Sequence, residues 1–277
     1  MVRNIKIAAL LTSHNRREVT VKAIAALKAA SKNFNINIFL VDDGSTDGTG
    51  NAVAALNLNI NIIQGGGSLY WNHGMRRAWL EARGCSPDFY LWLNDDLEVT
   101  PEAIAELMAT YRRAIGIDPK TIVVGKTLDP ETGEISYGGY VHEKGVSRLR
   151  WKRPGPDTLY CDTFNGNCVL FPASVFEDVG VNSADFRHSL GDIDYGLRAG
   201  RAGYKIVECD SAVGFQSRNV QVYSGGRLKF NFVNFQKVFF DPKGVPLVEW
   251  WKFCRRHAGP QWPINFVARY LKVFISR

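Results

Sequence analysis

The stretch Leu91–Val99 reads LWLNDDLEV and includes the end of an expected strand. It continues the apolar run Phe89–Leu93, which predicts a strand buried on both faces. The run ends at Asn94, Asp95 and Asp96, so adjacent carboxylates follow the strand directly. Such carboxylates repel each other and need a cation or several hydrogen-bond donors. This strand end is therefore a candidate site; the alternative is a solvated turn or a cap for the next helix.

Outward from this stretch, apolar runs alternate with segments of helical spacing. The expected strands are 5–12, 36–41, 60–63 and 89–93, and the expected helices are 16–31, 50–56, 72–83 and one opened by Pro101. This alternation predicts an α/β fold with an open, Rossmann-like, mostly parallel sheet flanked by helices. Ligands of such sheets bind beyond the carboxyl ends of the strands.

The second half of the chain is less regular. Strands are expected at 121–124, 135–137, 163–171 and 204–207, and short helices at 173–179 and 195–202. The strand at 163–171 carries a polar interruption, FNGN.

Polar motifs follow the first, second and fourth expected strands. They read TSHNR (Thr12–Arg16), DDGST (Asp42–Thr46) and NDD. The carboxyl ends of parallel strands meet at one edge of the sheet, so these motifs are expected to lie together. A carboxylate of DDGST could accept from a base or a ribose hydroxyl, although the same composition also forms Asx-type turns.

Two further segments contain candidate binding or catalytic groups. Gly65–Gly67 lies before an expected helix, where flexible backbone suits a diphosphate. Tyr70 and Trp71 could stack on a sugar face or pack in the core. Asp192 and Asp194 precede the helix expected at 195–202, as a general base or as helix caps, and the cap is favoured for Asp194.

Composition excludes several other classes. The chain has 277 residues, 45% hydrophobic and 22% charged, which fits one large globular domain, or one domain with an appendage. The run Ile7–Leu11 is too short for a signal-peptide core, and no stretch reaches the length of a membrane span. The five cysteines form no CxxC pair, which favours reduced thiols in the cytoplasm and argues against structural zinc.

The net charge of +7 belongs mostly to the C-terminal tail. Residues 241–277 contain seven Lys or Arg and two Asp or Glu, which leaves only +2 for the rest. The core is therefore not predicted to bind nucleic acid. Residues 245–277 mix aromatic and basic side chains, which suits either peripheral contact with an anionic membrane or packing on the core.

As a set, these motifs resemble glycosyltransferase family 2, whose inverting enzymes have the GT-A fold. The matching pieces are LTSHNR (11–16), VDDGSTDGT (41–49), LNDDLEV (93–99), FNGNCVLFPASVFEDVG (164–180) and GDIDYGLRAGRAGYKI (191–206). The segment SLYWNHGMRRAW (68–79) is similar to bacterial members that build surface polysaccharides, including rhamnosyltransferases.

The resemblance implies a metal-dependent, inverting glycosyltransferase acting in bacterial cell-surface polysaccharide synthesis. The donor would be a dTDP-, UDP- or GDP-sugar, and the acceptor a hydroxyl of a glycan or lipid-linked glycan. The GT-A domain would span residues 1–225 and a C-terminal helical appendage 226–277. The protein would be cytoplasmic, at the inner face of the plasma membrane if the tail contacts lipid.

The resemblance also implies roles for individual residues. The nucleotide would contact Thr12, His14, Asn15, Arg16, Asp42 and Asp95, and the sugar or acceptor Trp71, Asn72, Asn165 and Asp194. Asp96 would hold Mn²⁺ or Mg²⁺, and Asp192 would be the catalytic base. Arg218 and Arg227 could close over the diphosphate or lie in a solvated loop.

The sequence departs from the family pattern at three places. His14 stands where an aromatic Tyr is usual, and Gly191 replaces an acidic residue before Asp192. No His follows the last strand, so Gln216 and water are the candidates for the place of a metal ligand.

These departures keep one alternative open: a degenerate member that binds carbohydrate or a partner without turnover. Missing glycines after the first strand argue against a sugar-nucleotide pyrophosphorylase, and a missing GxGxxG argues against a dehydrogenase.

Overall fold

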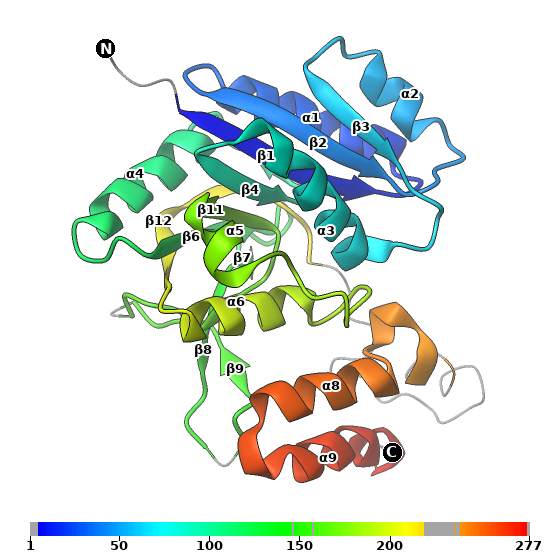
Figure 1. Ribbon diagram of the computed structural model, residues 1–277, viewed down its shortest axis with the longest axis vertical. Coiled ribbons are helices and arrows are strands. Elements are labelled where there is room, and N and C mark those ends of the chain that lie inside the picture. Colours follow the sequence, from blue (N-terminus) through cyan, green and yellow to red (C-terminus); the bar gives the residue numbers. More distant parts are fainter. Residues whose placement is uncertain (1–4, 146, 157, 219–235, 237–238, 276–277) are drawn as a thin grey trace.

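The computed structural model describes residues 5–145, 147–156, 158–218, 236 and 239–275, without the side chains of 272–275. Its centre is a sheet in the order β3-β2-β1-β4-β11-β6-β12-β5, with β7 beside β6 (Figure 1). The strands are β1 (Lys6–Ser13), β2 (Asn35–Asp42), β3 (Ile60–Gln64), β4 (Phe89–Leu93), β5 (Glu98–Val99), β6 (Thr121–Leu128), β7 (Ile135–Tyr137), β11 (Cys168–Pro172) and β12 (Lys205–Phe215). The expected mostly parallel sheet is confirmed: β3, β2, β1 and β4 run parallel, as do β6 and β12, whereas β11, β5 and β7 are antiparallel to their neighbours.

Helices cover both faces of this sheet. The helices α1 (Arg17–Ala30), α2 (Thr49–Ala54) and α4 (Ala103–Ile115) pack on one face, and α3 (Tyr70–Ala82), α5 (Ser174–Val179) and α6 (Gly191–Arg201) on the other. A short 3₁₀ helix, η1 (Arg83–Cys85), follows α3. The strands of a doubly covered sheet are apolar throughout, and β4 is buried at every position.

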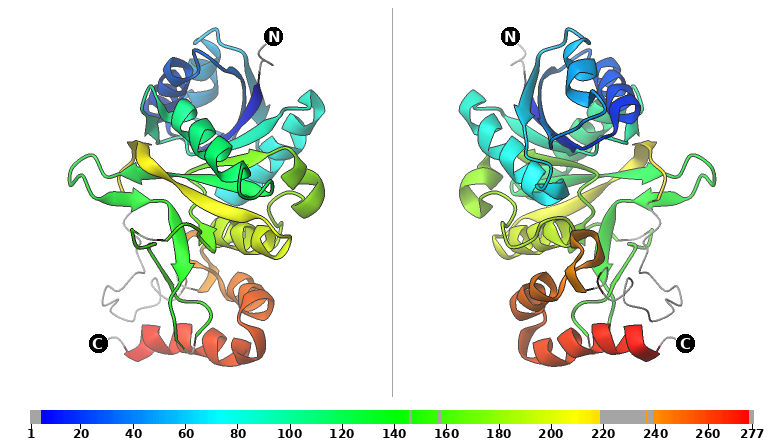
Figure 2. Two further views of the ribbon diagram at one scale, coloured as in Figure 1. Left: turned by 90° about the vertical axis from the view of Figure 1, so that its left-hand side faces the viewer. Right: turned by 90° about the vertical axis from the view of Figure 1, so that its right-hand side faces the viewer.

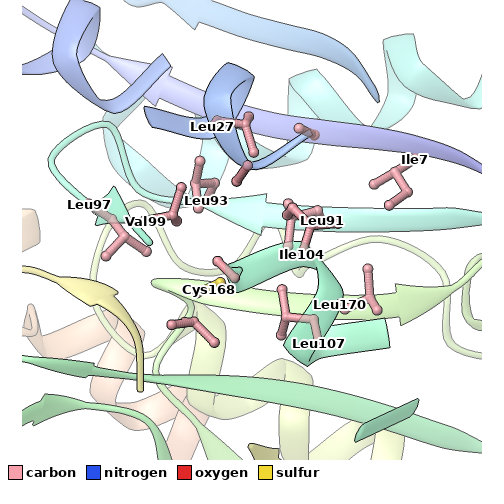
Figure 3. Packing of buried hydrophobic residues seen from close by; sticks show 14 of the residues in the cluster. Ile7, Leu27, Leu91, Leu93, Leu97, Val99, Ile104, Leu107, Cys168 and Leu170 are labelled. Carbon is pink, nitrogen blue, oxygen red and sulfur yellow. The ribbon is translucent and has the colours of Figure 1, made fainter. Parts of the chain in front are cut away.

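Alternate residues of the strands feed the two cores. On the face covered by α1 and α4, Leu91 and Leu93 of β4 meet Leu27, Ile104 and Leu107 (Figure 3). On the opposite face, Trp92 and Tyr90 pack with Trp79 of α3 and with Phe171 and Tyr195. This period of two fixes the register of β4 and therefore where its polar end emerges.

The region expected as a single strand at 163–171 is divided between two sheets. β10 (Thr163–Phe164) joins a small sheet with β8 (Gly139–His142) and β9 (Trp151–Lys152), whereas β11 lies in the main sheet. The chain turns at Gly166, where any side chain would collide with the ring of Trp71, since an added Cβ would lie 2.5 Å from it. The polar interruption is therefore the site of a sheet change.

Two other boundaries differ from expectation. The helix α6 begins at Gly191 rather than at Tyr195, so Asp192 and Asp194 lie in its first turn. Strand β12 extends to Phe215, well past the expected end at Val207, because it pairs with both β6 and β5.

The C-terminal segment forms a helical unit below the sheet (Figures 1 and 2). It contains η2 (Pro242–Gly244), α8 (Leu247–His257), η3 (Gly259–Gln261) and α9 (Trp262–Ile275). Trp250, Phe253, Cys254 and Tyr270 form a separate core with Phe186, which lies between α5 and α6. The expected boundary at 225/226 lies outside the described residues. Within the described part of the chain, no helix has the length and apolar character needed to cross a membrane.

Candidate active site

The candidate site lies at the edge of the sheet where β1, β2 and β4 end. Ser13 pairs with Asp42 in the β1–β2 register, and β4 runs parallel to them. The loop before β11 reaches the same edge, because β11 is antiparallel to β4 and Cys168 pairs with Leu93. TSHNR, DDGST, NDD and FNGN therefore meet, as the strand order requires.

The guanidinium of Arg16 joins the two carboxylates that follow β4. Its Nη1 donates to Asp95 Oδ1 at 2.9 Å, and its Nη2 donates to Asp96 Oδ2 at 2.6 Å. Burial acts to lower the pKa of Arg16, but both carboxylates outweigh it and the pKa is raised. The repulsion expected within NDD is thus relieved by an arginine from the loop after β1.

Asp95 is the more deeply buried of the two carboxylates. Burial raises its pKa to about 6, although the charge of Arg16 and hydrogen bonds from Ser13 and Thr20 act in the opposite direction. Desolvation therefore exceeds the compensation that the chain supplies to this carboxylate. A further positive charge nearby would therefore stabilise the ionised form of Asp95.

Gln216, at the end of β12, contacts Asp96 directly. Its Nε2 donates to Asp96 Oδ1, while its Oε1 accepts from Asn167 Nδ2 at 2.8 Å. Gln216 is the residue that, with water, was predicted to take the place of the missing histidine, and it does lie beside Asp96. In this arrangement the amide nitrogen faces Asp96, so Gln216 orients the carboxylate and does not present an oxygen to it.

Asp95 and Asp192 line the same cleft, which has a volume of about 1470 Å³. Its walls come from the ends of β1 and β4, from β7–β9, from the start of α6 and from η2 and α9. Ligand pockets for drug-sized molecules occupy roughly 300–1,000 Å³, so this cleft has room for two substrates.

Asp192 lies in the first turn of α6. Its Oδ2 accepts from the amide of Gly166 at 3.1 Å, and its Oδ1 accepts from the amide of Ile193 at 2.8 Å. Burial raises the pKa of Asp192, whereas these amides and the side chain of Asn165 act to lower it. A carboxylate with a raised pKa that remains hydrogen-bonded in its ionised form suits a general base.

A chain of contacts connects the two carboxylate sites. The indole N–H of Trp71 donates to Asn94 Oδ1 at 2.8 Å, beside Asp95. The same ring packs on Gly166, whose amide bonds Asp192. Trp71 therefore lies between the two groups and lines the cleft, where the sequence placed a contact with sugar.

Asn165 also lines the cleft beside Asp192. Its side chain acts to lower the pKa of the Asp192 carboxylate, and its Oδ1 is buried without a hydrogen-bond partner among the described residues. A buried amide oxygen left unpaired is costly unless a ligand donates to it.

The glycine turn before α3 is held by Asp43. Asp43 Oδ1 accepts from the amide of Gly67, and Oδ2 accepts from the amides of Leu69 and Tyr70. Of the stretch Gly65–Gly67, which was predicted to suit a diphosphate, the amide of Gly67 is therefore already bonded within the chain. The role of this stretch stays a prediction.

The loop after β1 forms an exposed ledge next to DDGST. His14 Nδ1 donates to the carbonyl of Asp43 at 2.6 Å, and Asn15 Oδ1 accepts from the amide of Thr46 at 2.8 Å. Asp42 Oδ1 accepts from the amide of Ser45 at 3.0 Å. Thr12 is buried against α3, whereas His14, Asn15 and Thr46 are exposed.

The structure assigns two predicted acceptor residues to the scaffold. Asn72 is fully buried and donates to the carbonyls of Ser183 and Phe186. Asp194 is also fully buried and is neither a helix cap nor a contact of the cleft. Both predictions failed because each side chain faces the interior from the first turns of its helix.

Asp194 instead anchors the C-terminal unit. It accepts from Arg198 at 2.9 Å, from Arg256 at 2.7 Å and from His257 at 2.8 Å. Burial acts to raise its pKa, but the hydrogen bond from His257 and the arginines outweigh it and lower the pKa. The helix that holds Asp192 is thereby tied to α8.

Arg218 lines the cleft, and its Nε donates to the carbonyl of Ser136 at 3.4 Å. Arg227, the other candidate for the diphosphate, lies outside the described residues. Sequence reasoning did not identify three cleft residues, namely His188, Lys243 and Arg269. For Lys243 and Arg269, the one signal in the sequence was the basic character of the C-terminal tail.

Comparison with known proteins agrees with this geometry. The sequence profile of Glycosyl transferase family 2 matches residues 9–171. The chain therefore belongs to this family and is a glycosyltransferase that uses a nucleotide-sugar donor. It is 22% identical over 211 residues to an N-acetylglucosaminyl-diphospho-decaprenol L-rhamnosyltransferase of Mycobacterium tuberculosis, covering 68% of each chain.

Solved structures share the fold. Residues 1–349 of TarS from S. aureus superpose with a TM-score of 0.56 and 15% identity, covering 98% of this chain and 72% of that one. The mannosyltransferase PcManGT from Pyrobaculum calidifontis, in complex with GDP-Man and Mn²⁺, has a TM-score of 0.59 and 15% identity, covering 96% and 70%. At this level of identity, the comparison concerns the fold.

Proposed function

We propose that this protein carries out inverting transfer of a hexosyl or deoxyhexosyl group from a nucleotide diphosphate to a hydroxyl of a glycan acceptor. The observation that carries the proposal is the placement of Asp95 and Asp192 on one large cleft, linked through Trp71. The Asp95 end has the features of a diphosphate site, and the Asp192 end those of a base.

The proposed reaction is a single displacement. Asp192 accepts the proton of the acceptor hydroxyl as the oxygen forms a bond to the anomeric carbon. The bond from that carbon to the diphosphate oxygen breaks on the opposite face, so the configuration inverts. The nucleoside diphosphate leaves with the electron pair. Asn165 holds the Asp192 carboxylate, and its free Oδ1 can accept from a substrate hydroxyl.

The carboxylates of Asp95 and Asp96 fit a divalent cation. Mg²⁺ and Mn²⁺ take one or two carboxylates and complete their shell with water and phosphate oxygens, and Asp95 is a carboxylate whose burial is not fully compensated. Asp96 would be the principal ligand, once Arg16 releases it. When bound, the cation stabilises negative charge on the departing diphosphate as a Lewis acid.

The nucleotide is assigned to the ledge formed by TSHNR and DDGST. His14 and Asn15 are exposed there and can contact the base, while Asp42 lies behind them. Thr12 is buried beside this ledge, against Gly74 of α3. Arg16 would move from the carboxylates toward the diphosphate, and Arg218 could approach it from the opposite wall.

The acceptor class is proposed as a glycan or lipid-linked glycan of a bacterial cell surface. The mycobacterial relative is named for transfer of L-rhamnose to N-acetylglucosaminyl-diphospho-decaprenol, and this name supports a lipid-linked acceptor. Residues 1–225 would form the catalytic domain, and 226–277 an appendage that closes the acceptor side.

The outer face of this appendage suits peripheral contact with the inner face of the plasma membrane. Ile264, Val267 and Leu271 form an exposed stripe on α9, with Ile264 71% exposed. Arg269 is about 200° around the helix from Val267 and Leu271, so the stripe faces away from the cleft. Packing on the core and contact with a membrane would therefore use opposite faces of α9.

A thermal-shift panel with UDP, GDP and dTDP, each with and without Mn²⁺ or Mg²⁺, tests the donor site. One nucleotide is expected to raise the melting temperature, and more so with metal. The corresponding nucleotide sugars are then assayed for release of the nucleoside diphosphate. Binding without turnover for every donor and acceptor would favour a non-catalytic carbohydrate-binding member, and no binding would contradict the proposal.

A further inference from the structure

The wall of the cleft formed by the C-terminal unit contains a partly buried guanidinium. Arg269 of α9 lines the cleft, donates from Nη2 to the carbonyl of Gly244 at 3.2 Å and lies over the ring of Trp250 at 5.3 Å. Its Nε is buried and has no hydrogen-bond partner among the described residues. The guanidinium is therefore fixed in place while part of its donor capacity is unused.

No carboxylate compensates this guanidinium in the described part of the chain. Burial lowers the pKa of Arg269, and the groups that act against it are Tyr270 and Cys254. Burial raises the pKa of each of these to about 12, so both are neutral at physiological pH.

Lys243 adds a second cation to the same wall. Its side chain is exposed on the cleft and makes no ion pair within 4.0 Å with any described residue. Asp241 lies nearby, but its Oδ1 accepts from the backbone amide of Lys243. His188 also lines the cleft, and burial lowers its pKa to about 4, so it is neutral.

A buried cation without a counter-ion is unfavourable unless a ligand supplies an anion. This wall contacts the loop that leads into α6, because Ser189 Oγ donates to the carbonyl of Lys243 at 3.3 Å, and the acceptor hydroxyl must lie beside Asp192 of α6 for its proton to be removed. The donor diphosphate is proposed to lie with Asp95 and Asp96. The missing anion is therefore part of the acceptor, and a phosphate matches the planar donor array of an arginine.

We propose that Arg269 and Lys243 bind a phosphate group of the acceptor, so that this transferase acts on a phosphate-linked glycan. The proposal rests on the proposed function, since it takes Asp192 as the base. It adds a second phosphate subsite, on the appendage, to the cleft.

The test uses n-hexyl phosphate as the probe in calorimetric titrations, with n-hexanol as the neutral control. The full chain is titrated with and without the nucleoside diphosphate and metal identified by thermal shift. The intact protein is expected to bind hexyl phosphate in both conditions and to show no binding of hexanol. Absence of hexyl phosphate binding would overturn the proposal.

The variants Lys243→Gln and Arg269→Gln are each expected to weaken hexyl phosphate binding at least about fivefold. Arg255→Gln is the matched control, since Arg255 is an exposed arginine of α8 that stacks on Trp251 outside the cleft. Lys243 is a surface residue, so its variant tests the site even if Arg269→Gln unfolds. Equal affinity in all three variants would overturn the proposal.

A vesicle assay distinguishes an acceptor phosphate from a lipid headgroup. Flotation with phosphatidylglycerol vesicles is expected to be unchanged in Lys243→Gln and Arg269→Gln, because the exposed stripe faces away from the cleft. Reduced flotation with unchanged hexyl phosphate binding would assign these cations to the membrane and overturn the proposal. Failure of nucleotide binding would instead contradict the proposed function, while hexyl phosphate binding to the free protein would still be measured.

Discussion

The two ends of the cleft balance their charges differently. At the Asp95 end, every ionic group has a partner within the chain, because Arg16 joins Asp95 and Asp96. At the opposite end, Arg269 and Lys243 have no carboxylate partner among the described residues. The first end is built from the edge of the sheet, and the second from helices added after it.

This difference indicates how a bound ligand would change the ionic contacts at each end of the cleft. At the Asp95 end, a ligand has to replace an existing ion pair, so binding there depends on competition between Arg16 and an incoming cation. At the Arg269 end, a ligand supplies a charge that the chain lacks. Asp192 lines the same cleft, and its helix α6 is tied to α8 through Asp194.

The largest effect is expected for Asp192→Asn. Asparagine keeps the shape but cannot accept the proton, so transfer should fall about 10³-fold. Donor binding should stay close to normal, because Asp192 does not contact Arg16, Asp95 or Asp96. Turnover and nucleotide affinity are measured on the same preparation.

The matched control is Asp210→Asn, which removes an exposed carboxylate far from the cleft and paired with Arg113. It should leave turnover within about twofold of the intact protein. Normal turnover of Asp192→Asn would show that the base is another group.

The next largest effect is expected at Asp194, which connects α6 to α8. Asp194→Asn leaves Arg198, Arg256 and His257 without their shared anion, and should lower the free energy of unfolding by about 3 kcal/mol. Urea denaturation followed by fluorescence measures this. Asp185→Asn is the control: Asp185 also pairs with Arg256 but is partly exposed, so its loss should cost about 1 kcal/mol or less. Equal costs would mean that the buried network does not hold the appendage.

These cases show how far the sequence predicts the fold. The doubly covered sheet follows from apolar runs such as Leu91–Leu93, whose burial on both faces leaves little choice of environment. The failures lie where a residue's environment comes from distant chain. Nothing local in FNGN shows that Gly166 must make room for Trp71, so the change of sheet between β10 and β11 was not predicted.

The residues of the candidate site also differ in how far the sequence predicts their positions. The meeting of TSHNR, DDGST and NDD, which includes Asp95 and Asp96, could be predicted because these motifs follow strands whose ends share one edge of the sheet, whereas Asp192 was proposed only through the family resemblance. Asp194 could not, since its partners Arg256 and His257 are more than sixty positions away. Arg269 and Lys243 were seen only as part of a basic tail, because lining of the cleft depends on how α9 packs against the catalytic half.

The pH dependence of transfer should report the environment of Asp192. Only the ionised carboxylate accepts a proton, and burial raises its pKa, so kcat should fall about tenfold per pH unit below that raised pKa. The side chain of Asn165 acts to lower this pKa. Asn165→Ala should therefore shift the acidic limb of the kcat profile to higher pH. A limb that stays in place, or moves to lower pH, would contradict the assignment of Asp192 or its contact with Asn165.

The smallest effect is expected at the paired end of the cleft. Arg16 holds both carboxylates, and its side chain is 41% exposed, so each ion pair is worth well under 1 kcal/mol. Arg16→Gln should increase the affinity of the nucleotide-free protein for Mn²⁺ about threefold, measured by electron paramagnetic resonance at pH 8. Arg17→Gln is the control for loss of a nearby positive charge, since Arg17 is exposed and makes no ion pair with any described residue. A decrease in Mn²⁺ affinity in Arg16→Gln alone would mean that Arg16 organises the carboxylates for the cation and does not compete with it. The paired end would then be preformed for metal, and the contrast with the Arg269 end would be one of charge sign alone.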